Sequence, residues 1–331
     1  GEYKKIVERE ACGMRGQDAR TLFDRVSRGE EGELLFDTKD PREGNRQYSR
    51  RFLPPRRLIL LGGGHISEKL VPLAAMLDFS VTVADDREEF ACAGRFPLAE
   101  KVICAPFEEA IDRLAITPYD FVAVMTRGHA WDGACLRRIL RGTMPAYLGM
   151  VGSKRKTALL REQLEEEGFE KEKLDRVEAP IGLKIGAVTP AEIGVSILAQ
   201  LILYRSQKEE AGPGVLACQE ADMALLKFMK ETEEDYVLAV ITEKKGSAPG
   251  REGALMAACR QGIAAGTVGG GSGEYQVLQA AKQALAEKKS RMVRVSLTGQ
   301  EAAGQGMICG GTMQVWLEYC PAEGKEKETR T

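Results

Sequence analysis

Histidine is scarce in this sequence, and the usual cysteine patterns are missing. The 331 residues include only two histidines, so a metal site built from histidine would have to use one or both. The eight cysteines form no C-x-x-C pair and no zinc-ligand spacing. In a reducing compartment, scattered cysteines are ordinarily free thiols or small core residues. The sequence therefore predicts no zinc site.

An excess of one charge and a long apolar run are also lacking. The 47 basic and 49 acidic residues leave a formal net charge of −2, so no basic excess indicates a nucleic-acid partner. Charged residues interrupt the longest apolar runs well short of the roughly 18 residues that a membrane helix needs. The first ten residues lack the apolar core of a signal peptide. We therefore expect no nucleic-acid or membrane partner and a cytoplasmic location.

Length and changes of pattern predict two domains with additions at both ends. Residues 1–55 are polar and weakly periodic, and we expect a partly ordered N-terminal extension there. The charged Pro/Gly segment SQKEEAGPG separates a domain at 56–206 from a second domain at 207–322. Residues 323–331 are expected to be a disordered tail.

The alternation of short apolar runs and helical segments in residues 56–206 predicts an α/β fold. RLILL, SVTVADD and DFVAVMT have the composition of parallel strands buried on both faces. Amphipathic helices between them indicate a Rossmann-like, doubly wound parallel sheet. Strands dominate residues 207–322 and crossover helices are few, which predicts a smaller α+β domain.

The first glycine turn fits a dinucleotide-binding fingerprint. LILLGGGHIS places Gly62, Gly63 and Gly64 between a strand and a helix. Asp85 ends the second strand. Its separation in sequence from the first glycine of the turn is close to the about 20 residues at which a carboxylate reaches a ribose hydroxyl. The alternative is a Rossmann-like fold whose site is degenerate or empty, since fold does not imply function.

Both histidines follow strands of this domain. His65 comes directly after the first strand, and His129 follows the fourth in TRGHAWD, with Arg127 beside it. If these two strands are neighbours at the topological switch point, both histidines face one crevice and could transfer protons or contact an anion. The alternatives are that His65 caps the end of a helix and that His129 is a turn residue with its hydrogen bonds satisfied. Arg155 opens a later helix in GSKRKTALL, where a phosphate contact and a solvated helix start both fit.

Three segments of the second domain combine glycine with polar or nucleophilic residues. They read KKGSAPGREG, GTVGGGSGEY and GQGMICGGTM. The middle one lacks the Lys-Ser/Thr of a P-loop, and its backbone could form an anion nest or simply tight turns. A cysteine beside two glycines can contact a ligand or soft metal, or be a buried structural residue. The candidate binding residues are Ser247, Arg251, Gly269, Gly270, Gly271, Glu274 and Cys309.

Together, the motifs GGGHIS, VTVADDREEF, TRGHAWD, GMVGSKRK, GTVGGGSGE and MICGG resemble the xanthine dehydrogenase accessory family (XdhC/CoxI) over about residues 56–319. The resemblance implies an accessory factor, a homodimer, that holds molybdenum cofactor (molybdopterin) while a cysteine desulfurase supports its sulfuration. The factor then delivers the cofactor to a xanthine dehydrogenase-type molybdenum hydroxylase. The residues that the resemblance implicates are the GTVGGGSGE loop and Cys309, as the neighbour of molybdenum, with His65, Asp85, His129 and the basic turn at 153–156.

Two departures from that family pattern are present. The family usually places its CGG-containing domain before the Rossmann domain, and here the order is reversed. Arg251 stands one place later than the arginine that the family has after the proline. The resemblance implies a non-catalytic accessory protein, and no catalytic residue is predicted. The alternatives are an NAD(P)-dependent oxidoreductase and a non-catalytic nucleotide-binding regulatory module.

Overall fold

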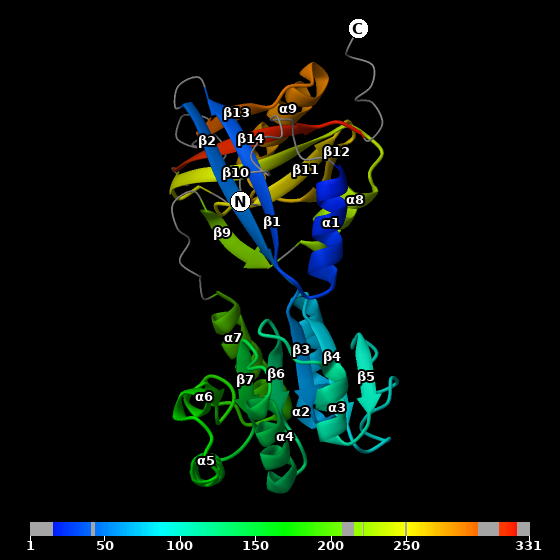
Figure 1. Cartoon of the computed structure of the whole chain (residues 1–331), viewed down its shortest axis with the longest axis vertical. Coiled ribbons are helices and arrows are strands. Elements are labelled where there is room, and N and C mark those ends of the chain that lie inside the picture. Colours follow the sequence, from blue (N-terminus) through cyan, green and yellow to red (C-terminus); the bar gives the residue numbers. More distant parts are fainter. Residues whose placement is uncertain are drawn as a thin grey trace, which may run out of the picture. The chain divides into compact units, whose positions relative to one another are not determined.

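The chain forms two compact units, which are described separately. The computed structural model describes residues 16–40, 44–206, 215–220, 222–248, 250–296 and 311–322. Residues 55–207 form one unit, here called the parallel unit, and residues 1–54 with 208–331 form the other, here called the discontinuous unit (Figure 1). Among the described residues, no helix is long and apolar enough to span a membrane.

The parallel unit is built on one six-stranded sheet in which all neighbouring strands are parallel. Its strands are β3 (Arg57–Leu61), β4 (Ser80–Asp85), β5 (Lys101–Cys104), β6 (Phe121–Val124), β7 (Tyr147–Met150) and β8 (Val177–Glu178). Their order is β5-β4-β3-β6-β7-β8, with Leu61 level with Ala84 on one side and Val124 on the other. The strand order therefore reverses between β3 and β6, which confirms the predicted doubly wound sheet and its switch point.

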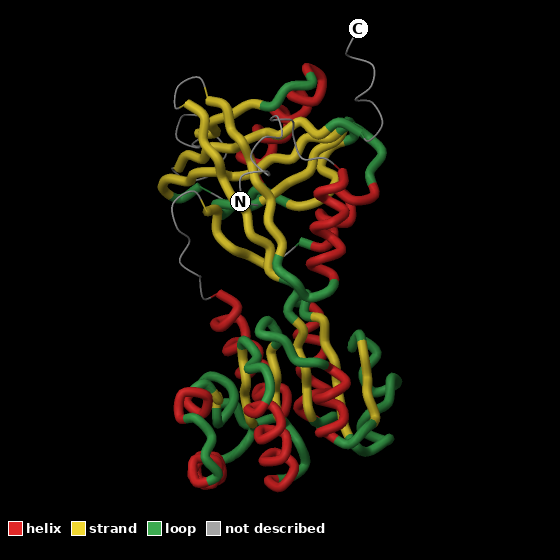
Figure 2. The backbone as a smooth tube through the Cα atoms, in the orientation of Figure 1, coloured by secondary structure: helices red, strands yellow, loops and turns green. Residues whose placement is uncertain are grey.

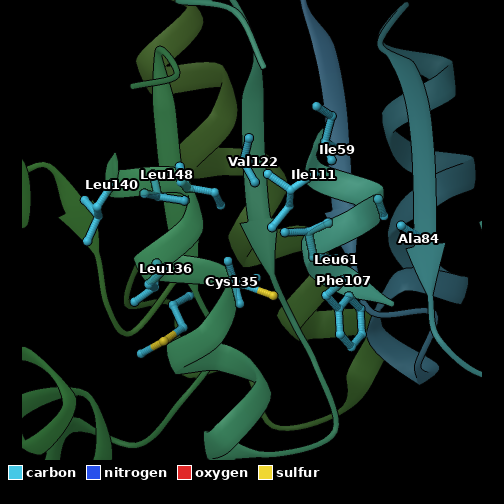
Figure 3. Close-up of a cluster of buried hydrophobic side chains, with 14 of the residues drawn as sticks. Ile59, Leu61, Ala84, Phe107, Ile111, Val122, Cys135, Leu136, Leu140 and Leu148 are labelled. Atoms are coloured by element: carbon cyan, nitrogen blue, oxygen red, sulfur yellow. The ribbon is translucent and has the colours of Figure 1, made fainter. Parts of the chain in front are cut away.

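Helices cover both faces of this sheet because successive strand residues point to opposite sides. The helices are α2 (His65–Met76), α3 (Phe107–Leu114), α4 (His129–Arg141), α5 (Lys154–Glu166), α6 (Lys171–Asp175) and α7 (Pro190–Ser206). Ile59 and Leu61 pack in a cluster with α3, α4 and α5, part of which Figure 3 shows. Leu58 and Leu60 pack in a second cluster with α2 and α7. All four side chains are fully buried, as the all-apolar run RLILL predicts.

The discontinuous unit contains a five-stranded antiparallel sheet of order β12-β11-β10-β14-β13. Its elements are α8 (Met223–Glu231), β10 (Tyr236–Gly246), β11 (Leu255–Cys259), β12 (Gly262–Gly266), α9 (Gly271–Glu287), β13 (Arg291–Ser296) and β14 (Gly311–Cys320). Val237 and Ala239 pack in a cluster with α9, whereas Leu238 and Val240 pack in the cluster that contains α8. This arrangement confirms the predicted α+β fold, and Figure 2 shows how strands dominate the unit.

The N-terminal segment is an integral part of the discontinuous unit. It comprises α1 (Gly16–Ser27), β1 (Gly32–Asp40) and β2 (Gly44–Leu53), and it forms a separate sheet with β9 (Val215–Glu220) in the order β1-β2-β9. Leu22, Phe36 and Phe52 are buried in one cluster with Leu226 and Trp316. The sequence predicts a partly ordered N-terminal extension at residues 1–55. The described part of this extension packs with the discontinuous unit, because its apolar side chains complete the core of that unit.

Candidate functional site

The first glycine turn is packed tightly at two of its three glycines. Gly62 has φ +124°, and a Cβ there would lie 2.1 Å from the carbonyl oxygen of Met125. A Cβ on Gly63 would lie 2.0 Å from the carbonyl oxygen of Phe90. A Cβ on Gly64 would meet no atom within 4 Å, and no side chain caps α2 at this residue. Gly62 and Gly63 therefore serve close packing, and Gly64 leaves the amino end of α2 accessible.

Asp85 holds the turn from inside the protein. Its side chain is fully buried, and Oδ2 accepts hydrogen bonds from the Gly63 N–H at 2.8 Å and from Nη2 of Arg87 at 3.1 Å. Oδ1 accepts from the Arg87 N–H at 3.1 Å and from its Nε at 2.9 Å. The sequence assigns Asp85 to a ribose hydroxyl. In the structure both of its oxygens are engaged within the chain, so that contact would require Arg87 to move.

A second acid, Asp86, lies half-buried at the same edge of the sheet. Asp86 follows β4 and Arg127 follows β6, and these strands flank β3. Arg127 donates two hydrogen bonds to the Asp86 carboxylate, one of them from Nη2 to Oδ2 at 2.8 Å. The guanidinium also lies 4.7 Å from the ring centre of Trp131. These hydrogen bonds hold the pKa of Asp86 below its usual value. A ligand that binds at this edge of the sheet must therefore compete with this ion pair or use its charges.

The two histidines lie at the same edge of the sheet, where neighbouring strands β3 and β6 end. His65 is the first residue of α2, its side chain is 78% exposed, and its Nδ1 lies 3.9 Å from Oε2 of Glu68. His129 is the first residue of α4 and is also exposed. Arg155 is exposed in the first turn of α5, after the next strand, β7. The neighbouring strands predicted before the two histidines are confirmed, whereas a shared crevice and the roles of the histidines stay predictions.

Two residues of this region were not assigned to the site from the sequence. Asp86 stands next to Asp85, and only the structure shows that the second acid of VTVADD is the one near the surface. Arg95 donates from Nε to the Gly63 carbonyl at 3.1 Å and pairs with Glu68 at 2.8 Å. This arginine lies in a stretch without helix or strand, so no periodicity indicates its partner. The pair of adjacent aspartates in VTVADD was the one sequence signal that could have indicated Asp86.

Asp132 should make the stability of the parallel unit depend on pH. Asp132 is 8% exposed, and its carboxyl group accepts a 2.6 Å hydrogen bond from the Thr126 hydroxyl. Burial raises the pKa of Asp132 above its ordinary 3.8, an effect that this hydrogen bond opposes. The folded state then holds the proton more tightly than the unfolded state. The stability that the Asp132 carboxyl group contributes is consequently present below pH 3.8 and is lost as pH rises through the raised pKa.

We therefore expect Asp132→Asn, which carries no charge, to be more stable than the parent chain at pH 7. The advantage should shrink as the pH falls toward the ordinary pKa of aspartic acid. Urea unfolding followed by fluorescence over a pH series measures it. Glu166→Gln on the exposed side of α5 is the matched control. A constant difference between Asp132→Asn and the parent at all pH values would contradict the assigned cause.

In the discontinuous unit, the described parts of the three glycine-containing segments come together. The last residue of β10, Gly246, pairs with the first of β14, Gly311. A Cβ on Gly311 would lie 2.4 Å from the amide nitrogen of Ala248. A Cβ on Gly250 would lie 2.3 Å from the carbonyl oxygen of Val268. The turn at 246–253 therefore touches both the second glycine loop and the start of β14. Ser247 and Arg251 are exposed on this turn.

The second glycine loop is a nest of backbone amides that surrounds a carboxylate. Gly269, Gly270 and Gly271 have φ of +117°, +73° and +67°, which side chains rarely tolerate. Oε2 of Glu274 accepts hydrogen bonds from the N–H of Val268 at 3.0 Å, from the N–H of Gly270 at 3.2 Å and from the Thr267 hydroxyl. The loop thus has the geometry of an anion nest, and the anion it holds is its own glutamate.

One side of this loop remains accessible. A Cβ on Gly270 would meet no atom within 4 Å, although the Gly270 N–H itself donates to Glu274. An anion could approach the amino end of α9 from there. Cys309, predicted as a neighbour of the metal, lies outside the described residues, two places before Gly311 in the chain. Among the residues that the structure does describe, no group of His, Cys, Asp and Glu could hold a metal.

The N-terminal segment supports this site through Arg50 of β2. Its side chain is 4% exposed, and Nε donates a 2.8 Å hydrogen bond to the carbonyl of Gly253, at the end of the 246–253 turn. A Cβ on Gly253 would lie 3.1 Å from Cδ of Arg50 and 3.3 Å from Cβ of Leu216 in β9. Gly253 also has φ +80° and donates its N–H to Ile241 at 2.8 Å. Strands β2 and β9 therefore fix one end of the turn.

Replacing Arg50 by Met should destabilise the discontinuous unit by about 2 kcal/mol, because the buried Gly253 carbonyl would lose its charged donor. Urea unfolding followed by the fluorescence of the buried Trp316 measures this, in a Trp131→Phe background. The control is Arg51→Met, which removes a half-exposed ion pair with Glu31 and should change stability by less than about 1 kcal/mol. Equal losses in the two variants would contradict the role given to Arg50.

Two family models match the chain, and their order is the reverse of the usual family order, as the motifs predict. The XdhC Rossmann domain model matches residues 58–201, inside the parallel unit. The XdhC and CoxI family model matches residues 229–296, inside the discontinuous unit. The two ranges together take up more than half of the sequence. The chain belongs to the XdhC and CoxI family, with its Rossmann domain first.

Individual relatives match about half of the chain. It is 35% identical over 151 residues to the uncharacterized protein YqeB of Escherichia coli K12, which covers 45% of this chain and 27% of YqeB. It is 32% identical over 160 residues to a probable xanthine dehydrogenase subunit of Bacillus subtilis 168. This match covers 48% of this chain and 46% of the relative. A crystal structure of a xanthine dehydrogenase from Bacillus halodurans is 31% identical, with coverages of 53% and 50% and a TM-score of 0.45. The chain spans less than half the length of both curated relatives.

Proposed function

We propose that this chain is an accessory protein for a xanthine dehydrogenase-type molybdenum hydroxylase. Membership of the XdhC and CoxI family is the observation that carries the proposal. The name of the Bacillus subtilis relative, a probable xanthine dehydrogenase subunit, adds support for the partner. The role is non-catalytic: the chain holds molybdenum cofactor while a cysteine desulfurase supports its sulfuration, and then passes it to the hydroxylase. A homodimer is part of the same proposal, and sedimentation equilibrium tests it.

The residues of the discontinuous unit suit such a cofactor. Its phosphate needs backbone amides or cations, and the amides in the first turn of α9 beyond those that donate to Glu274, beside the open Gly270, offer the first. Ser247 and Arg251 on the adjoining turn offer a hydroxyl and a cation. We propose that these groups hold the phosphate end and that Cys309 lies near the metal. When bound, the cofactor supplies the molybdenum and sulfur chemistry that the hydroxylase uses.

Maturation of the hydroxylase in cells tests this function. We expect cells without this protein to make the hydroxylase polypeptide with at least tenfold less activity, and the intact chain to restore it. Cys309→Ala should not restore activity. Cys259→Ala is the matched control, because Cys259 is at the far end of β11 from the 246–253 turn. Normal hydroxylase activity in the deletion strain would show that this chain is not needed for maturation.

A nucleotide in the crevice of the parallel unit is a second proposal. The open amino end of α2 at Gly64 and the exposed Arg127 favour a ligand with phosphate groups. The buried and fully engaged Asp85 does not favour the usual ribose contact of NAD(P) enzymes. Calorimetric titration with NAD⁺, NADH, NADP⁺ and NADPH tests the proposal. Binding without turnover would favour a regulatory nucleotide, binding with hydride transfer an oxidoreductase, and no binding at millimolar concentration would remove both.

A further inference from the structure

The parallel unit contains a cavity that belongs to neither glycine turn. Its volume is about 360 Å³, near the lower end of the range for small-molecule sites. Residues of α4, α5, α6 and the segment from β8 to Pro180 line it. Its floor is apolar and consists of Leu136, Met150, Leu160, Leu164, Leu174 and Val177. The first five belong to the core cluster of Figure 3, in which Leu136 is labelled, and Val177 packs against that cluster.

Polar side chains are few in this lining. Lys154, Thr157 and Arg161 are the three polar residues around the cavity. The Arg161 charge is already compensated, because Nε donates to Glu165 at 2.9 Å and Nη2 donates to Asp175. A ligand rich in hydrogen-bonding groups, such as a pterin, would therefore find few partners here. The cavity favours a ligand whose body is apolar.

Lys154 adds a positive charge at the mouth. It is exposed, and no ion pair with an acid is found for it in the part of the chain that the structure describes. It is the first residue of α5, a helix of 13 residues, so the positive end of the helix adds to its charge. Arg155 and Lys156 follow it and are exposed. An apolar floor beside an uncompensated cation suits a molecule with one apolar end and one anionic end.

We propose that this cavity binds a small organic anion with an apolar body, namely an aromatic or branched aliphatic carboxylate. The body lies on the leucine floor between α4 and α5, and the carboxylate accepts a hydrogen bond from Nζ of Lys154. Burial of the body supplies affinity, and the charged hydrogen bond selects the anion over its neutral analogue. The site does not depend on the proposed role with a hydroxylase. It lies beside the C-terminal end of β7, two strands from the first glycine turn.

Paired probes test this site on the full chain by isothermal titration calorimetry. Indole-3-acetate represents the anion, and indole represents its neutral analogue. We expect one saturable site for indole-3-acetate per chain. Lys154→Met should weaken indole-3-acetate binding about tenfold or more, the effect of losing a charged hydrogen bond, and leave indole binding unchanged. Lys101→Met, at the opposite edge of the sheet, should change neither affinity.

A blocking variant separates this site from binding elsewhere. Ala158 lines the cavity and is exposed on α5, so Ala158→Phe places a ring at the mouth without disturbing the core. It should abolish binding of both probes while circular dichroism stays the same. Absence of a saturable site in the parent chain would overturn the proposal. So would an Ala158→Phe variant that binds indole-3-acetate like the parent, or equal weakening of both probes by Lys154→Met.

Discussion

Gly62→Ala is expected to cost the parallel unit about 3 kcal/mol or more of folding free energy. Two effects add at this residue: its φ of +124° is unfavourable for alanine, and the new methyl group would lie 2.1 Å from the carbonyl oxygen of Met125. The neighbouring atoms are backbone of the β6 end, which cannot rotate away as a side chain could. A lowered midpoint of the parallel unit in calorimetry measures the loss.

The matched control is the third glycine of the same turn. Gly64 has φ −70°, and a Cβ there would meet no atom within 4 Å, so Gly64→Ala should change stability by less than about 0.5 kcal/mol. The methyl group would instead narrow the approach to the amino end of α2, and it should weaken any nucleotide bound there. Equal destabilisation by the two substitutions would show that the turn is not packed as described.

Removal of residues 1–54 is expected to prevent the discontinuous unit from folding. The deletion takes six buried apolar side chains from the core that they share with α8 and β10: Ala19, Leu22, Val26, Leu34, Phe36 and Phe52. Their burial represents roughly 10 kcal/mol, comparable to the whole stability of an ordinary domain. It also takes Arg50, which holds the 246–253 turn at Gly253. Solubility and near-ultraviolet circular dichroism of the shortened chain measure the effect.

The deletion should leave the folding and stability of the parallel unit unchanged. Its two core clusters contain residues of 55–207 alone, so a chain of those residues should fold by itself and unfold cooperatively. A soluble 55–331 chain with both unfolding transitions intact would contradict the part assigned to the N-terminal segment. Loss of both transitions would show that the two units depend on each other for folding.

The fold of the parallel unit could be predicted because its signals are local. RLILL is entirely apolar, the glycine turn follows at once, and the alternation with helical segments repeats along the chain. The part played by residues 1–54 could not be predicted. The partners of α1 and β2 lie about 200 residues further along the chain, as with Arg50 and Gly253. Periodicity within the segment shows an apolar side and does not show what covers it.

The candidate site was predictable in its residue types and less so in their contacts. Glycines with positive φ were expected at 269–271, in either an anion nest or a set of tight turns. That Glu274 occupies the amides of this loop was not, because a glutamate in the first turn of a helix equally fits a solvated side chain. Asp85 and Asp86 are indistinguishable in sequence. Burial alone separates the acid that holds Gly63 from the acid that pairs with Arg127.

The proposed cofactor-holding role is tested by identifying the molecule that is bound to the isolated protein. Native mass spectrometry of the full chain, produced in cells that make molybdenum cofactor, gives the mass of any bound molecule. We expect one pterin cofactor per chain, retained by Cys259→Ala and lost from Cys309→Ala. A bare polypeptide mass from cofactor-competent cells, under conditions in which another cofactor-binding protein keeps its pterin, would contradict it.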